Sequence, residues 1–194
     1  MKSHRLLLFL TALILSNVAY AANQPTKADV TTRLRDGWRM QSSCKVEKTG
    51  AEVSTPAFSD VDWYPVTVPT TVVSALVKLH KYPDPDFGMN LRKLPGMTYP
   101  IGENFSNIAT RQDSPFMVPW WFRKTFILPA TDKGKTLWLD FGGINYRANI
   151  FLNGKQIGTY DDVAGAWRTY EFNITDVALP GRKRVHHIAA SRHQ

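Results

Sequence analysis

The chain has almost no cysteine: Cys44 is the only one among its 194 residues. A single thiol cannot form a disulfide within the chain, so a stable fold must depend on an ordinary apolar core. An isolated cysteine in a strand-like stretch is most often a small buried residue, and we expect this of Cys44. The adjacent His186 and His187 have no partners at the spacing of a zinc site. We therefore expect neither a bound metal nor a catalytic thiol.

Long hydrophobic runs are absent except at the N-terminus. Lys2 and Arg5 precede an apolar run over residues 6–15, and Ala19-Tyr20-Ala21 follows as a cleavage site of small residues. This order is typical of a secretory signal peptide, and the run is short for a membrane span. We predict that residues 1–21 are a signal peptide and that the protein is exported by a bacterium, to the periplasm or beyond. The alternative is an N-terminal membrane anchor.

Acidic residues are missing from the last part of the chain, which explains much of the formal charge of +8. The predicted signal peptide carries Lys2 and Arg5, and residues 182–194 carry four more cations and no acid, so the remaining body has a net charge of only +2. A nucleic-acid-binding protein usually gathers its cations on one face that follows the phosphates. We expect no nucleic-acid partner.

Helical periodicity is also scarce, and the body of the chain is predicted to consist of short strands separated by turn residues. Asn153-Gly154 lies between two alternating segments and predicts a hairpin with a type I′ turn. Only residues 70–80 repeat apolar residues at helical spacing, behind a threonine that can cap a helix. Many short strands favour an all-β sandwich or jelly roll. The predicted strands are residues 38–46, 64–68, 121–128, 136–141, 146–152, 156–160 and 168–173.

One segment, residues 83–119, has little periodicity and six prolines. A loop of this length in a compact domain is usually functional or disordered. Its many aromatic and aliphatic residues disfavour disorder, because they gain free energy by burial. We expect the segment to fold against the rest of the domain.

Four motifs stand in a fixed order along the chain: VPTTVVSALVKLHKYPDPDFGMNL, VPWWFRKTFILP, LDFGGINYRANIFLNGKQIG and VAGAWRTYEFNIT. Together they resemble the N-terminal sugar-binding domain of glycoside hydrolase family 2, in particular the branch of exo-β-glucosaminidases and β-mannosidase-like enzymes. The resemblance covers about residues 36–181. It implies an all-β, galactose-binding-like jelly-roll sandwich over residues 22–181, with one short helix and a long proline-rich loop.

The resemblance also implies a function. Such a domain opens a longer retaining enzyme, in which two glutamates on a (β/α)8 barrel hydrolyse terminal β-linked glucosaminides or mannosides. That barrel is not part of this sequence, so we expect the chain alone to be catalytically silent, and no cofactor is implied. The alternative is a self-standing, secreted carbohydrate-binding module.

The same resemblance suggests which residues form the rim of a sugar pocket, because loops of this domain approach the catalytic barrel in the family. A catalytic pair of aspartates is a much weaker interpretation of PDPDFG than turn formation by Asp-Pro. Two adjacent tryptophans would offer a stacking platform, although packing of both is the favoured alternative. The rim candidates are Asp84, Asp86, Asn90, Arg92, Trp120 and Trp121.

A second group of residues is predicted to have structural or interdomain roles, in preference to direct contact with sugar. They are polar or aromatic residues on or just before predicted strands, and the arginines can pair with carboxylates here or in further domains. This group consists of Arg123, Asn145, Tyr146 and Arg147. Three further aromatic residues, Trp138, Trp167 and Tyr170, are expected mainly in the sandwich core.

The segment RKRVHHIAASRHQ, residues 182–194, departs from the family pattern, which continues there with an apolar strand. It has no clear alternation, and we interpret it as a non-family basic tail, either an out-of-frame or premature ending or a genuine tail. In both cases we expect a missing strand, an unpaired sheet edge and poor solubility.

Overall fold

The computed structural model describes residues 30–99, 102, 110–178 and 185–193. The chain divides into two compact units at Arg33, and every helix and strand described lies in the second unit, Leu34–Gln194. Within the described ranges, no helix has the length and apolar character needed to cross a membrane.

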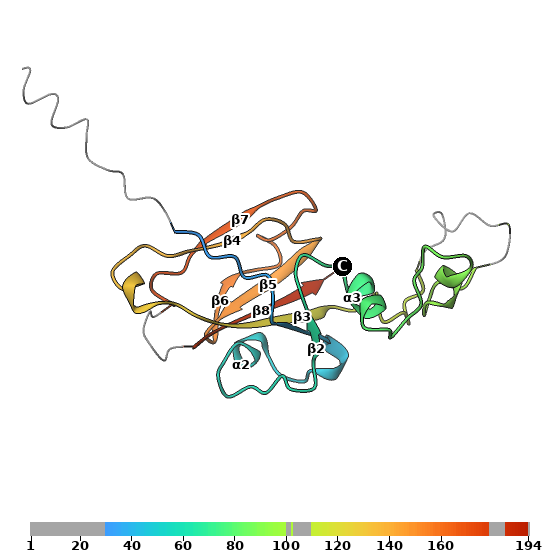
Figure 1. Cartoon of the computed structure of the whole chain (residues 1–194), viewed down its shortest axis with the longest axis horizontal. Coiled ribbons are helices and arrows are strands. Elements are labelled where there is room, and N and C mark those ends of the chain that lie inside the picture. The colour runs from blue at the N-terminus through green and yellow to red at the C-terminus, as the bar shows by residue number, and fades with distance from the viewer. Residues whose placement is uncertain (1–29, 100–101, 103–109, 179–184, 194) are drawn as a thin grey trace, which may run out of the picture. The chain divides into compact units, whose positions relative to one another are not determined.

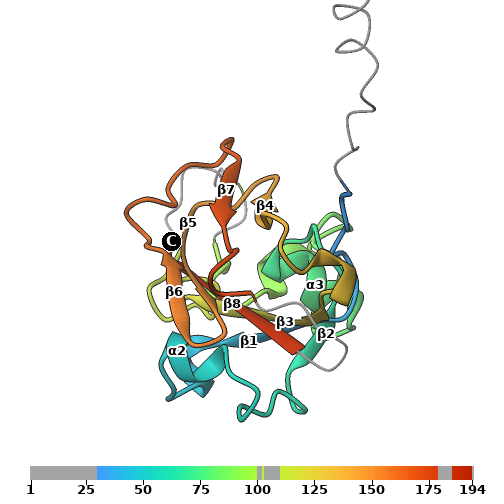
Figure 2. The ribbon, with the colours of Figure 1, turned by 90° about the vertical axis from the view of Figure 1, so that its left-hand side faces the viewer.

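Most of this unit is a six-stranded antiparallel sheet faced by a second, two-stranded one (Figures 1 and 2). Figure 2 shows the small sheet on one side of the large sheet and helix α2 on the other. The large sheet has the order β2 (Tyr64–Val66), β1 (Trp38–Ser42), β3 (Trp120–Ile127), β8 (Val185–His193), β5 (Arg147–Leu152) and β6 (Lys155–Gly158). The small sheet pairs β4 (Trp138–Phe141) with β7 (Tyr170–Asn173).

The helices are short and lie between strands. They are α2 (Gly50–Val53), α3 (Val72–Lys78) and the 3₁₀ turns η1 (Ser43–Lys45), η2 (Asn90–Lys93) and η4 (Ala130–Asp132). The α3 helix was predicted, and Thr71 caps it by accepting a hydrogen bond from the Ser74 amide. The prediction of a single helix was incomplete, since α2 is too short to show a period in the sequence. Its signature is a capping box instead.

The predicted strands are all present, with bounds that differ by a few residues, and the all-β fold class is confirmed. The hairpin is confirmed as well: Asn153 and Gly154 have φ of 52° and 86°, the left-handed values that a type I′ turn requires. Ile150 and Leu152 on β5 are fully buried on one face, while Phe151 packs against Trp121 on the other.

The expectation of a missing strand after residue 181 was wrong. Strand β8 (Val185–His193) lies in the middle of the large sheet and pairs antiparallel with both β3 and β5. Its ladder is formed by backbone groups, which do not require strict side-chain alternation, so the irregular pattern misled the sequence interpretation. The origin of the tail as a frameshift stays a prediction.

Apolar side chains occupy both faces of the large sheet. The main core lies toward the β4–β7 sheet and α3, and includes Met40, Leu76 and Leu152. A smaller cluster on the opposite face contains Val53 and Trp121.

Three expectations about burial need correction. Cys44 is exposed, because the chain turns into η1 after Ser42 instead of continuing as a strand. Trp138 and Trp167 are 58% and 99% exposed, so neither belongs to the core, whereas Tyr170 packs beside Val163. In β4 the inward position is taken by Leu139, which leaves Trp138 on the outer face.

The capping box of α2 predicts a pH dependence of stability. Thr49 and Glu52 exchange hydrogen bonds between side chain and backbone, and these bonds, with Lys48, lower the pKa of Glu52 to about 2. A carboxyl with a lowered pKa stabilises the fold above its unfolded value of 4.5 and loses this effect as pH falls toward 2. Glu52→Gln should therefore lower the melting temperature at pH 6 more than at pH 2.5.

Thermal unfolding followed by circular dichroism at the two pH values would measure this difference. Glu171→Gln, an exposed carboxyl on β7, is the matched control and should change little at either pH. An equal loss at both pH values for Glu52→Gln would contradict the capping interpretation.

Candidate functional site

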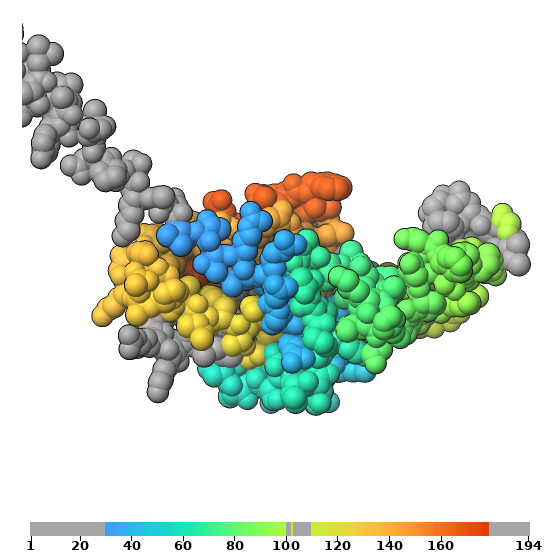
Figure 3. Space-filling view, in the orientation of Figure 1, coloured from blue at the N-terminus to red at the C-terminus, as the bar shows by residue number. Residues whose placement is uncertain are grey.

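Four of the six predicted rim residues, Asp84, Asp86, Asn90 and Arg92, lie on the long segment between α3 and β3, and the other two lie on β3. In Figures 1 and 3 the described part of this segment extends from α3 away from the sheet. Asp84 accepts a hydrogen bond from the Asp86 amide at 3.0 Å, which is the turn geometry typical of Asp-Pro. Both carboxylates are exposed, with Phe87 and Met89 next to them, 76% and 55% exposed. Residues 84–89 therefore present two acids and two apolar side chains to solvent.

Asn90 and Arg92 follow on η2. The Asn90 side chain accepts a hydrogen bond from Lys93 Nζ at 2.8 Å, and the Arg92 guanidinium lies 5.0 Å from the centre of the Tyr99 ring. Arg92 Nη1 is buried without a hydrogen-bond partner among the described residues. The two residues are thus held by local contacts, beside the turn that carries Asp84 and Asp86.

Parts of the segment are packed into the core, as expected for its described part. Leu94 and Ser114 are each 2% exposed, and Ser114 Oγ donates to the Pro95 carbonyl at 2.9 Å. Phe116 packs edge-on against Tyr82 at 5.7 Å. The segment is therefore held at several points, while Asp84 and Asp86 stay exposed.

Trp120 and Trp121 do not form a platform for sugar in this structure. They are 6% and 7% exposed and point to opposite faces of β3, as neighbours in a strand must. Trp120 belongs to the main core and donates from Nε1 to the Pro115 carbonyl at 2.9 Å. Trp121 packs against Val53 and Trp63 on the other face.

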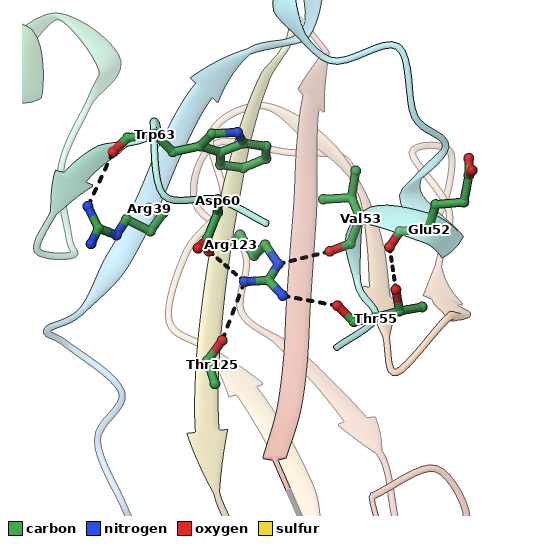
Figure 4. A network of polar contacts seen from close by, with 8 residues as sticks. All are labelled: Arg39, Glu52, Val53, Thr55, Asp60, Trp63, Arg123 and Thr125. Carbon is green, nitrogen blue, oxygen red and sulfur yellow. Dashed lines mark hydrogen bonds and ion pairs between the residues drawn. The ribbon is translucent and has the colours of Figure 1, made fainter. Parts of the chain in front are cut away.

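Arg123 is a structural residue within the domain (Figure 4). It is 3% exposed, and its guanidinium forms an ion pair with Asp60. It also donates to the carbonyls of Val53 at 2.9 Å and Thr55 at 3.1 Å, and lies 5.7 Å from the Phe58 ring. One buried cation thus ties the α2 segment to the outer face of the large sheet.

Asn145, Tyr146 and Arg147 lie at the start of β5. The Arg147 guanidinium lies near two tyrosine rings, 5.6 Å from the centre of Tyr146 and 5.7 Å from that of Tyr160. Its Nη1 also reaches Asp161 Oδ1 at 3.5 Å. This aromatic and charged group is on the surface, since both rings are nearly half exposed.

The sheet register relates the two predicted groups. Arg192 on β8 is opposite Trp120 on one side and Ala148 on the other, and His193 is opposite Arg147. The end of the long segment at Trp120 and the start of β5 therefore lie at the same end of the large sheet.

Sequence reasoning missed several residues of these groups. Asp60, the partner of Arg123, has no local signal, because the pair is 63 positions apart in the chain. Tyr160, Asp161 and Trp167 lie on the turn-rich loop between β6 and β7, where aromatic residues in a polar context are a signal for surface function. Among the described residues, no three His, Cys, Asp or Glu side chains gather in a group suited to a metal.

Comparison with known proteins agrees with this fold. Residues 100–192 match the family model of the glycosyl hydrolase 2 galactose-binding domain-like domain, a range that includes most of the segment we expected to be non-family. The exo-β-D-glucosaminidase of Streptomyces avermitilis is 34% identical over 149 residues, which are 77% of this chain and 14% of that protein. A mannosylglycoprotein endo-β-mannosidase of Lilium longiflorum is 29% identical over 78% of this chain and 14% of its own length.

A solved structure shows the same architecture. The crystal structure of the Amycolatopsis orientalis exo-chitosanase CsxA superimposes with a TM-score of 0.67 and 29% identity, covering 86% of this chain and 17% of that one. The chain thus spans about a seventh of the curated relatives that it matches. The family match, the sequence relatives and the shared fold show that this chain belongs to glycoside hydrolase family 2, as its galactose-binding-like N-terminal domain.

Proposed function

We propose that this chain is the non-catalytic first domain of an exported, exo-acting β-glycosidase that removes terminal glucosaminide or, less favoured, mannoside units. The observation that carries the proposal is its 34% identity, over 77% of its length, to an exo-β-D-glucosaminidase. Export is supported by the signal-like order of residues 1–21.

The domain itself is proposed to shape the rim of the sugar pocket. The long segment is anchored at Leu94 and Ser114 and leaves Asp84 and Asp86 exposed. An exposed carboxylate suits the ammonium group of a glucosamine unit, since a charge-assisted hydrogen bond is stronger than a neutral one. A glycosidase acid, by contrast, works in an apolar enclosure, which the exposed turn at Asp84 and Asp86 does not provide.

The test is a chimera in which the aligned segment of the Streptomyces avermitilis enzyme is replaced by the matching part of this chain. We expect it to hydrolyse p-nitrophenyl β-D-glucosaminide, whereas the 194-residue chain alone shows no turnover. Asp84→Ala and Asp86→Ala in the chimera should raise KM about tenfold, because each removes a contact to the amine. Unchanged KM for both variants would contradict the rim role.

Reading the DNA that follows the codon for Gln194 in all three frames is the complementary test. We expect sandwich domains and a barrel with two glutamates to follow. Sequencing the N-terminus of the exported protein tests the leader, and we expect it to begin at Ala22.

A second candidate function is carbohydrate binding by this domain alone. The observation that favours it is Trp167, which is 99% exposed. A tryptophan so exposed on a folded domain is typical of a binding surface.

A further inference from the structure

The surface at the start of β5 and on the loop between β6 and β7 has an unusual composition. Tyr146 and Tyr160 are 45% and 44% exposed, and Trp167 on the same loop is 99% exposed. Gly165 donates its amide to the Tyr146 carbonyl at 2.9 Å, and Arg147 pairs with Ala164 in a β-bridge, so the loop is tied to β5. The three rings therefore belong to one connected surface, which we call the aromatic rim.

The aromatic rim is held in shape by charged groups. The Arg147 guanidinium lies 5.6 Å from the centre of the Tyr146 ring and 5.7 Å from that of Tyr160, and its Nη1 is 3.5 Å from Asp161 Oδ1. The attraction between the cation and the ring faces favours these positions of the two tyrosines. Two rings are thus positioned before any ligand arrives, which lowers the entropy cost of binding.

The exposed apolar groups of this rim are all aromatic. Exposed aliphatic residues, such as Val61, Ile127 and Met89, lie on other elements. A guanidinium and a carboxylate lie among the rings, so this surface carries both aromatic faces and polar groups. Such a surface suits a ligand that has both an apolar face and polar edges.

A pyranose ring matches this chemistry. Its C–H face packs flat on an aromatic ring, and its hydroxyl groups bond to carboxylate, amide and guanidinium groups at the edge. Asp161 is the more exposed charge, with 69% of its side chain accessible against 35% for Arg147. The Arg147 cation already lies near both tyrosine rings, so the preference for a cationic sugar rests on Asp161, whose more exposed carboxylate can bond to an ammonium group.

We propose that the aromatic rim, formed by Tyr146, Arg147, Tyr160, Asp161 and Trp167, binds a β-linked oligosaccharide of glucosamine. These residues lie on other segments than Asp84 and Asp86, and the proposed site binds the saccharide without any chemical step. The choice of glucosamine rests on the proposed function, but the site itself is tested on this chain alone.

The experiment is a titration of the full 194-residue chain with a chitosan tetramer, followed by isothermal calorimetry and tryptophan fluorescence. A β-1,4-mannan tetramer serves as the neutral comparison. We expect saturable binding of the chitosan tetramer that Trp167→Ala weakens about tenfold or more. Trp138→Ala is the matched control: Trp138 is also exposed, but lies on β4, and its loss should leave binding unchanged.

Asp161→Asn separates the charge from the stacking. It should weaken the chitosan tetramer severalfold and leave any binding of the mannan tetramer unchanged, since only the former carries ammonium groups. Circular dichroism confirms that each variant is folded.

Two results would overturn the proposal: no binding of the chitosan tetramer at millimolar concentration, or binding that Trp167→Ala does not alter. Neither result bears on the chimera, whose activity tests the proposed function independently.

Discussion

Replacing Arg123 by methionine is expected to lower the free energy of unfolding by about 3–4 kcal/mol. Arg123 is 3% exposed, and its guanidinium pairs with Asp60 and donates hydrogen bonds to the carbonyls of Val53 and Thr55. Methionine fills a similar volume but leaves a carboxylate and two carbonyls without their hydrogen-bond donor. A polar group that loses its partner inside the fold lowers the free energy of unfolding. Urea unfolding at neutral pH measures the loss from the midpoint and slope.

Arg39→Met is the matched control, because Arg39 is the register partner of Arg123 on β1. Arg39 is less buried and donates to the Trp63 carbonyl at 3.3 Å, a long hydrogen bond, so we expect a loss below about 1 kcal/mol. Combining Arg123→Met with Asp60→Asn should cost clearly less than the sum of the two single losses. If the two single losses add exactly in the double variant, or if Arg123→Met costs less than about 1 kcal/mol, the contacts of Arg123 do not stabilise the fold as proposed.

Replacing Gly50 by alanine is expected to destabilise the fold by about 2 kcal/mol. A Cβ at this position would lie 2.2 Å from Cε2 of Phe151, far inside contact distance. In a helix, alanine is usually more stable than glycine by up to about 1 kcal/mol. The destabilisation expected here is therefore opposite in sign to the effect of helix propensity. The close approach of α2 to β5 is the physical reason.

The same unfolding assay can separate overlap from helix propensity. In a protein that also carries Phe151→Leu, Gly50→Ala should lower the free energy of unfolding much less, because leucine leaves room for the added methyl group. Gly142→Ala is the control, since a Cβ there meets nothing within 4 Å and its effect should stay within about 0.5 kcal/mol. A stabilised Gly50→Ala variant would contradict the packing of α2 beneath the hairpin.

Local patterns predicted the elements well, and for a physical reason. The Asn153-Gly154 turn depends on backbone conformations that few residues adopt, and the alternation of Ile150 and Leu152 follows from the pleat of a strand. Both signals extend over only a few neighbouring residues, so they can be recognised without knowing the rest of the fold. The α3 helix follows in the same way from its apolar spacing and the Thr71 cap.

Burial of individual aromatic residues was predicted less well. Trp121 is buried because the α2 segment covers the outer face of β3, and Trp167 is exposed because its loop extends beyond the sheet pairing. Both outcomes depend on which segment covers which face. A hydrophobicity pattern cannot show this, since a tryptophan suits a core and a binding surface alike.

The sequence by itself determined the strand pattern, the hairpin, one helix and the family of this protein, because each of these depends on short motifs or on their order. Only the tertiary structure decided that residues 185–193 complete the large sheet between β3 and β5. It also decided that Arg123 has its partners 63 and 70 positions away, and that Arg147 on β5 lies near Tyr160 and Asp161 of the loop after β6. These contacts join segments distant in the chain, and their free energy arises only when the whole sheet has formed.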